Sequence, residues 1–163
     1  IICVSLIAFV AILKVLDVER LKGSVFALFN KGFIEDEVEE NTSFFDLFQI
    51  VLFIFSITTI ALTLNFIRHT FQENYLFSFQ SFLYLFVTTF VYFLVKFSLE
   101  SSILTLFLIQ KELRFYRVSK HAYLYSISFV LFVFFLLFHY NALQPTFFLP
   151  LVFFLFVIKF LIH

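Results

Sequence analysis

The residues best suited to bind a charged group lie in the basic stretch Lys111–His121, in which aromatic residues alternate with basic ones. Its candidate side chains are Lys111, Arg114, Arg117, Lys120 and His121. Basic side chains beside a bilayer are attracted to anionic lipid, each by about 1 kcal/mol. We therefore interpret the stretch as a juxtamembrane anchor that contacts lipid headgroups. A specific site for a phospholipid or for a phosphorylated substrate is the alternative.

Lys96 and Glu100 extend this candidate polar or lipid-headgroup site, because they stand four positions apart at the edge of an apolar segment. On one continuous helix they share a face and can pair. An ionisable pair inside a membrane segment is a candidate functional site. We favour the simpler interpretation that Lys96 extends to the interface while Glu100 lies among the headgroups. We expect Glu100 to meet a basic partner, with Lys96 the nearest and Lys111 or Arg114 able to fold back.

The residue types give little support for a metal site or a catalytic site. The single Cys3 excludes a cysteine-based metal cluster, and none of the four histidines is spaced with a glutamate or a second histidine as a helical metal motif requires. The chain contains no nucleophile elbow and no phosphate-binding loop. We predict no catalytic residue, no metal and no cofactor, and the residues favour a protein that is not an enzyme.

The composition indicates a membrane protein. Of 163 residues, 63% are hydrophobic and 13% are charged, whereas a soluble domain is about half apolar and about a quarter charged. A protein with such an excess of hydrophobic residues is stable where lipid is the solvent. The net charge is zero, which leaves no basic footprint for nucleic acid. We expect the lipid bilayer and other membrane proteins as partners, and no nucleic acid.

Apolar stretches separated by charged loops predict one all-α, polytopic membrane domain over residues 1–163 with about five transmembrane helices. The predicted spans cover residues 1–16, 47–67, 75–95, 122–138 and 147–163. A crossing needs about 20 residues, and the 14 residues of segment 97–110 reach only about 21 Å. We therefore predict that segment 97–110 is a short re-entrant or interfacial helix that does not cross. Residues are also expected before Ile1, because it is not an initiator methionine.

The distribution of basic residues supports this topology. With segment 97–110 not crossing, nine bases lie on one side and only Arg68 on the other, which predicts that the nine-base side is cytoplasmic. The nine are Lys14, Arg20, Lys22, Lys31, Lys96, Lys111, Arg114, Arg117 and Lys120. If the segment crossed, the bias would vanish. We expect a multi-pass protein of a bacterial inner membrane, with Ile1 outside and His163 inside.

The cytoplasmic loop 17–46 contains three further features. The apolar spacing in Leu21–Phe33 is typical of one face of a helix, and with the nearby bases it predicts an interfacial helix or a docking helix. The acidic run Glu35–Glu40 is interpreted as a solvated loop. Ser43 and Asp46 fit a capping box ahead of the second span.

Hydroxyl side chains also occur inside the predicted spans. They are Thr58, Thr59, Thr63, Ser126 and Ser128. We expect each to bond its own helix or a neighbouring one.

The order of these features resembles an uncharacterised inner-membrane family of the Bacteroidota, described only as domain of unknown function number forty-two seventy-one. The points of likeness are "ALFNKGF" after the first span, "EENTSFFDLF" before the second, and "LFLIQKELRFYRVSK" after the third. Where the family pattern suggests an Asn-Lys pair, this chain has Gln110-Lys111, and a further C-terminal span expected of such families is absent from these residues. The resemblance implies residence in the inner membrane and supplies no activity.

Three classes of function remain open. We rank first a non-catalytic subunit or assembly factor of a cell-envelope complex. A small transporter or channel comes second, supported by segment 97–110 and Glu100, because non-helical backbone at depth usually lines a cavity. A membrane enzyme acting on a lipid or polyprenyl-linked substrate comes third and would use Lys111–His121.

Overall fold

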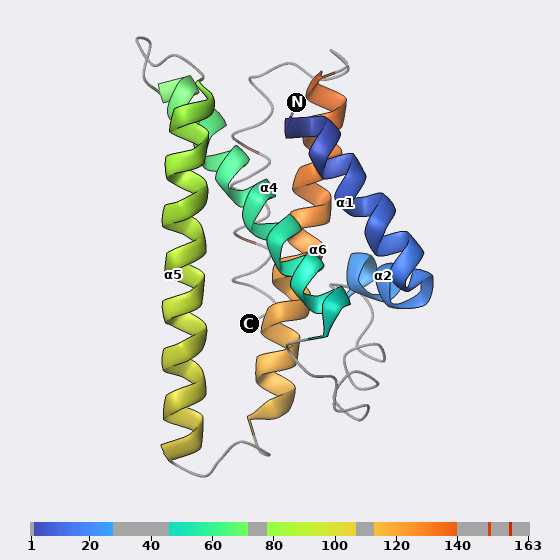
Figure 1. Ribbon diagram of the computed structural model, residues 1–163, viewed down its shortest axis with the longest axis vertical. Coiled ribbons are helices and arrows are strands. Elements are labelled where there is room, and N and C mark those ends of the chain that lie inside the picture. Colours follow the sequence, from blue (N-terminus) through green and yellow to red (C-terminus); the bar gives the residue numbers. More distant parts are fainter. Residues whose placement is uncertain are drawn as a thin grey trace.

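The computed structural model describes residues 2–27, 46–71, 78–106 and 113–139, with the single positions 150 and 157. In these residues it consists of five α-helices without a strand, which confirms the all-α prediction (Figure 1). The helices are α1 (Ile2–Leu16), α2 (Val18–Phe26), α4 (Leu47–Phe71), α5 (Phe79–Leu106) and α6 (Arg114–His139). The acidic run, Ser43 and, apart from the two single positions, the predicted span 147–163 lie outside the described residues.

Three of these helices are long and apolar enough to cross a membrane. The apolar parts cover Leu47–His69 of α4, Phe79–Ile103 of α5 and Phe115–Leu137 of α6, with 23, 25 and 23 residues. Each exceeds the roughly 20 residues that a crossing needs. The apolar part of α1, Val4–Leu16, is shorter.

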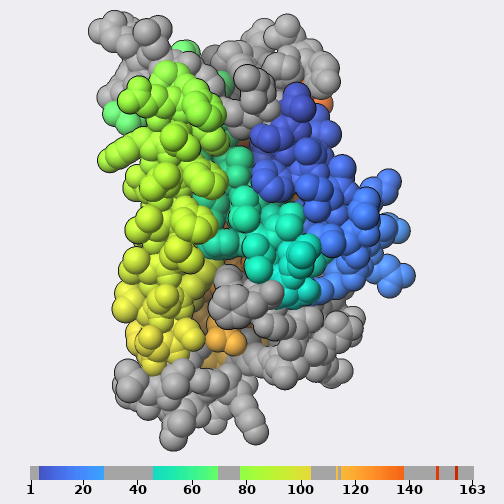
Figure 2. All heavy atoms as spheres, in the orientation of Figure 1, coloured from blue at the N-terminus to red at the C-terminus, as the bar shows by residue number. Residues whose placement is uncertain are grey.

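α4 is the central helix of the bundle. It packs against α1, α5 and α6, while α2 packs against α1 and α6. α5 descends along one edge of the molecule and α6 rises beside the other helices (Figures 1 and 2). In consequence the end of α1, the start of α4, the end of α5 and the start of α6 lie toward one end of the bundle (Figure 1).

Aromatic rings hold α5 and α6 against α4. The Phe55 ring of α4 is completely buried, with its centroid 4.7 Å from that of Phe129 on α6. The Phe53 ring lies 6.3, 6.4 and 5.4 Å from three rings of α5. These belong to Phe90, Phe93 and Phe97, which continue a stripe that begins with Phe82 and Phe86. Aromatic pairs at such distances contribute about 0.5–1.5 kcal/mol beyond area burial.

The five hydroxyl groups singled out in the sequence bond helix carbonyls, as expected. Thr58, Thr59 and Thr63 donate to the carbonyl four residues earlier in α4, at 2.7, 2.9 and 2.8 Å. Ser128 does the same in α6, at 2.8 Å. Ser126 instead donates across helices to the carbonyl of Val25 in α2, at 2.6 Å. The Ser126 bond holds the end of α2 against the middle of α6.

The structure differs from the sequence expectation at segment 97–110. Residues 97–106 continue α5 without interruption, so the chain does not turn after Lys96. The segment contains neither glycine nor proline, the residues that most readily break a helix. The Ser102 hydroxyl donates to the Ser98 carbonyl within the helix, at 2.8 Å. That the segment does not cross a membrane stays a prediction.

Candidate functional site

An ion pair joins α5 to α6 near the end of the bundle that carries the predicted site. The ammonium of Lys120 on α6 contacts the carboxylate of Glu100 on α5. The two side chains are 23% and 28% exposed, so the pair is partly shielded from solvent. Glu100 thus has a basic partner, but the partner is Lys120 rather than the expected Lys96. The i,i+4 rule selects neighbours on one helix, whereas the contact arises because two helices pack side by side.

Lys96 contacts aromatic rings instead. Its ammonium lies 5.9 Å from the centre of the Tyr92 ring and 5.8 Å from that of Phe93. A cation over a ring face is attracted by the ring quadrupole, by about 0.5–1 kcal/mol at exposed positions. Among the described residues, Lys96 contacts these rings and no carboxylate.

His121 lies where α6 packs against the charged part of α5. Its ring packs edge-on against Phe97 of α5, with centroids 4.5 Å apart. The charges of Lys96, Glu100, Arg117 and Lys120 all act on the imidazole. We call these five residues, Lys96, Glu100, Arg117, Lys120 and His121, the basic cluster. It contains three basic side chains and one carboxylate together with a histidine.

The structure therefore gathers five of the seven predicted site residues. Arg114 is the first residue of α6, and its side chain is outside the described part. Lys111 is also outside it. No group of three or more His, Cys, Asp or Glu residues that could hold a metal occurs in the described residues. The basic cluster can bind an anion, and nothing in it is arranged for nucleophilic attack.

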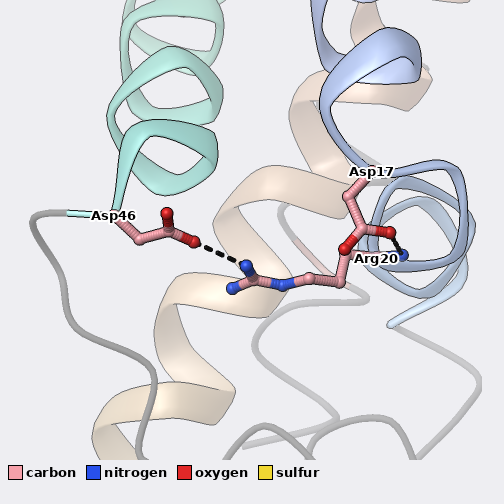
Figure 3. A network of polar contacts seen from close by, with 3 residues as sticks. All are labelled: Asp17, Arg20 and Asp46. Atoms are coloured by element: carbon pink, nitrogen blue, oxygen red, sulfur yellow. Dashed lines mark hydrogen bonds and ion pairs between the residues drawn. The ribbon is translucent and has the colours of Figure 1, made fainter.

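A second polar group connects α1, α2 and α4 and was not predicted from the sequence. Figure 3 shows Arg20 reaching from α2 toward Asp46, the residue before α4; the guanidinium Nη1 is 2.5 Å from the Asp46 carboxylate. The backbone N–H of Arg20 donates to the Asp17 carboxylate at 2.9 Å, which caps the start of α2 (Figure 3). The guanidinium also lies 4.9 Å from the centre of the Phe48 ring.

The Arg20 contact adds a role for Asp46 that the sequence did not predict. The capping box of Ser43 and Asp46 stays a prediction, because Ser43 lies outside the described residues, whereas the Asp46 carboxylate pairs with Arg20. The Asp17 cap could have been found from its position three residues before Arg20. The pair of Arg20 and Asp46, 26 positions apart, has no local signal.

A comparison with models of known protein families gives a match over the whole chain. The family model described as "Domain of unknown function (DUF4271)" matches residues 1–163. The chain belongs to this family. No curated protein and no solved structure matches the DUF4271 chain.

Membership in DUF4271 confirms the family resemblance and adds no activity, because the family itself is defined as a domain of unknown function. Its described residues carry the features quoted for the resemblance only in part. Leu106 and residues 113–120 belong to the third quoted motif, and Asp46, Leu47 and Phe48 end the second. The source in the Bacteroidota stays a prediction.

Proposed function

We propose that this DUF4271 chain is a non-catalytic subunit or assembly factor of a cell-envelope complex in a bacterial inner membrane. The observation that carries the proposal is the exposure of α5. Only 11% of its apolar window is buried inside the molecule, compared with 61% for α4 and 50% for α6. α5 forms one edge of the molecule in Figure 2. A helix with so little of its surface covered has room for a partner.

The outer face of α5 has a composition suited to another helix. Between the exposed rings of Tyr84 and Tyr92, it presents the short side chains of Val87, Thr88 and Val91. The Thr88 hydroxyl is satisfied within the helix by the Tyr84 carbonyl at 2.8 Å. These three side chains are shorter than the tyrosine rings beside them, and van der Waals packing between such surfaces drives the association of membrane helices. Three phenylalanines of α5, Phe90, Phe93 and Phe97, face α4 instead, where they contact Phe53.

The distribution of charges supports one orientation in the membrane. α1 ends and α4 begins toward one end of the bundle (Figure 1). Lys14 is in the last turn of α1 and Lys22 is in α2, whereas Arg68 is in the last turn of α4, toward the opposite end. Cytoplasmic loops carry the excess of lysine and arginine. We infer that the end with Lys14 and Lys22 is cytoplasmic and that α4, α5 and α6 each cross the membrane.

Neither alternative function is supported as directly. The transporter hypothesis depended on non-helical backbone at membrane depth, and α5 is helical through Leu106. The enzyme hypothesis depended on Lys111–His121, of which residues 114–121 form the first turns of α6. The enzyme hypothesis would be favoured only if a substrate were observed bound at the basic cluster.

Co-purification from native membranes tests the proposal. The tagged protein should retain a membrane partner in mild detergent, and Val91→Trp should release it because the indole blocks close approach of a second helix. Val133→Trp on α6 is the matched control, since Val91 and Val133 are both 51% exposed. Equal retention by both variants would exclude the α5 face, and absence of any stoichiometric partner would exclude the subunit proposal.

A further inference from the structure

The basic cluster has more positive charge than its one carboxylate can neutralise. The Glu100 carboxylate pairs with Lys120, which leaves the charges of Lys96 and Arg117 without a carboxylate among the described residues. Lys96 lies one turn before Glu100 on α5 and Arg117 lies one turn before His121 on α6, so the pair of Glu100 with Lys120 brings the three basic residues to one junction of the two helices. An excess of two cations over carboxylates in a partly dehydrated position favours an anion.

The position of the cluster indicates which anion. The Phe97 ring contacts Phe53, in the second turn of α4, at 5.4 Å, and it also contacts His121. The cluster therefore lies beside the first turns of α4, where the apolar part of that helix begins at Leu47. This is the level of the headgroups if α4 crosses the bilayer. The lipid phosphates lie at this level, at the boundary of the hydrocarbon.

Two exposed tyrosines border the cluster. Tyr92 lies under the Lys96 ammonium and Tyr116 lies 5.7 Å from that of Lys120, measured to the ring centre. Both rings remain more than half exposed, at 60% and 51%. Tyrosine is enriched at the membrane interface, where its ring is apolar and its hydroxyl reaches water. The tyrosines supply an apolar surface for the upper acyl chain of a lipid whose phosphate contacts the cations.

We propose that the basic cluster is a binding site for the phosphate group of an anionic phospholipid, with Lys96 and Arg117 as its principal contacts. Glu100 holds Lys120 in place and also weakens the site by offsetting one positive charge. The lipid site and the partner face of α5 both border on Tyr92, but different residues test them: Lys96 and Arg117 for the lipid, and Val91 for the partner.

Native mass spectrometry of the detergent-purified protein tests the site. The probes are phosphatidylglycerol, phosphatidylcholine with the same acyl chains, and inorganic phosphate. Phosphatidylglycerol should bind, phosphatidylcholine should bind more weakly, and inorganic phosphate should not displace the lipid at equal concentration. Displacement by inorganic phosphate would assign the site to a soluble anion and overturn the lipid assignment.

Substitutions distinguish a specific lipid-binding site from nonspecific electrostatic attraction between the protein and anionic lipid. Lys96→Gln and Arg117→Gln should each weaken phosphatidylglycerol binding by about fivefold, the equivalent of about 1 kcal/mol per base. Lys22→Gln removes an exposed base from α2 and should leave the affinity unchanged. Lys96→Arg, which keeps the charge, should retain binding. Equal losses for Lys22→Gln and Lys96→Gln would show that no specific site exists.

Glu100→Gln should change the affinity for lipid in the opposite direction from the Lys96 and Arg117 variants. Removing the carboxylate releases Lys120 for the ligand, so phosphatidylglycerol should bind at least as tightly, even though the variant loses an ion pair. The melting temperature without lipid verifies that each variant is folded. Weaker lipid binding by a folded Glu100→Gln variant would contradict the proposed role of the cations.

Discussion

The Lys120 ammonium and the Glu100 carboxylate form an ion pair between helices, 20 positions apart in the chain. α5 otherwise packs mainly against α4. Together with the ring contact of Phe97 and His121, the pair attaches the far half of α5 directly to α6. A contact that joins two helices near one end of the bundle can stabilise their relative position.

Glu100→Gln should lower the melting temperature in detergent, by the equivalent of about 1 kcal/mol or less, because the pair is partly exposed. Adding Lys120→Gln should restore part of the loss, since the second change removes the cation that the first leaves unpaired. Adding Lys96→Gln should not. A double-mutant cycle by thermal unfolding measures the coupling, and coupling to Lys96 in place of Lys120 would contradict the structure.

Arg20→Leu should destabilise the protein more than Lys22→Leu on the same helix. Arg20 loses its pair with Asp46 and its contact with the Phe48 ring, together about 1 kcal/mol for partly exposed groups. Lys22 is exposed and serves as the control. Thermal unfolding at low and high salt provides the measurement, and the difference between the variants should shrink at high salt. Equal melting temperatures would show that the Arg20 contacts add nothing.

Ser126→Ala should loosen α2 from the bundle. The Ser126 hydroxyl supplies a bond to the Val25 carbonyl in α2, and hydrogen bonds between membrane helices contribute about 0.6 kcal/mol on average. Ser128→Ala is a matched control, because Ser128 is equally buried but bonds a carbonyl of its own helix. Limited proteolysis near α2 should accelerate in Ser126→Ala alone. Identical cleavage rates in both variants would indicate that the bond does not hold α2.

The proposed orientation predicts which thiols an impermeant reagent can reach in intact cells. In a Cys3→Ser background, Lys22→Cys and Leu113→Cys should resist labelling, because both positions belong to the end with the basic cluster. Arg68→Cys, at the other end of α4, should react. All three positions are exposed in the structure. Labelling of Leu113→Cys but not Lys22→Cys would mean that the two positions lie on opposite sides.

The sequence predicted the features that depend on local pattern. Hydropathy placed the start of the central helix at Leu47, where α4 begins, and the end of the first apolar stretch at Leu16, where α1 ends. The length of α5 was missed because Lys96 and Glu100 suggested an end to the apolar run, although charged residues do not interrupt a helix. An α-helix is held by hydrogen bonds of the backbone, and these continue through Lys96. Only the hydropathy of the sequence changes at this position.

The contacts between distant residues could not be predicted in the same way. Local spacing suggested Lys96 as the partner of Glu100, and the actual partner, Lys120, becomes a neighbour only when α5 and α6 lie together. The same holds for Arg20 and Asp46. The pattern of charged residues did indicate which residues would form the basic cluster, because most of them come from one stretch of the chain.

Site-specific photo-crosslinking in native membranes tests the proposed subunit role most directly. A photoreactive phenylalanine analogue at Val91, on the outer face of α5, should form a discrete adduct with another membrane protein. The same analogue at Val133, equally exposed on α6, is the reference position. The account predicts a protein adduct that is specific to Val91. Crosslinks from Val91 to lipid alone, under conditions in which Val133 gives the same pattern, would contradict it.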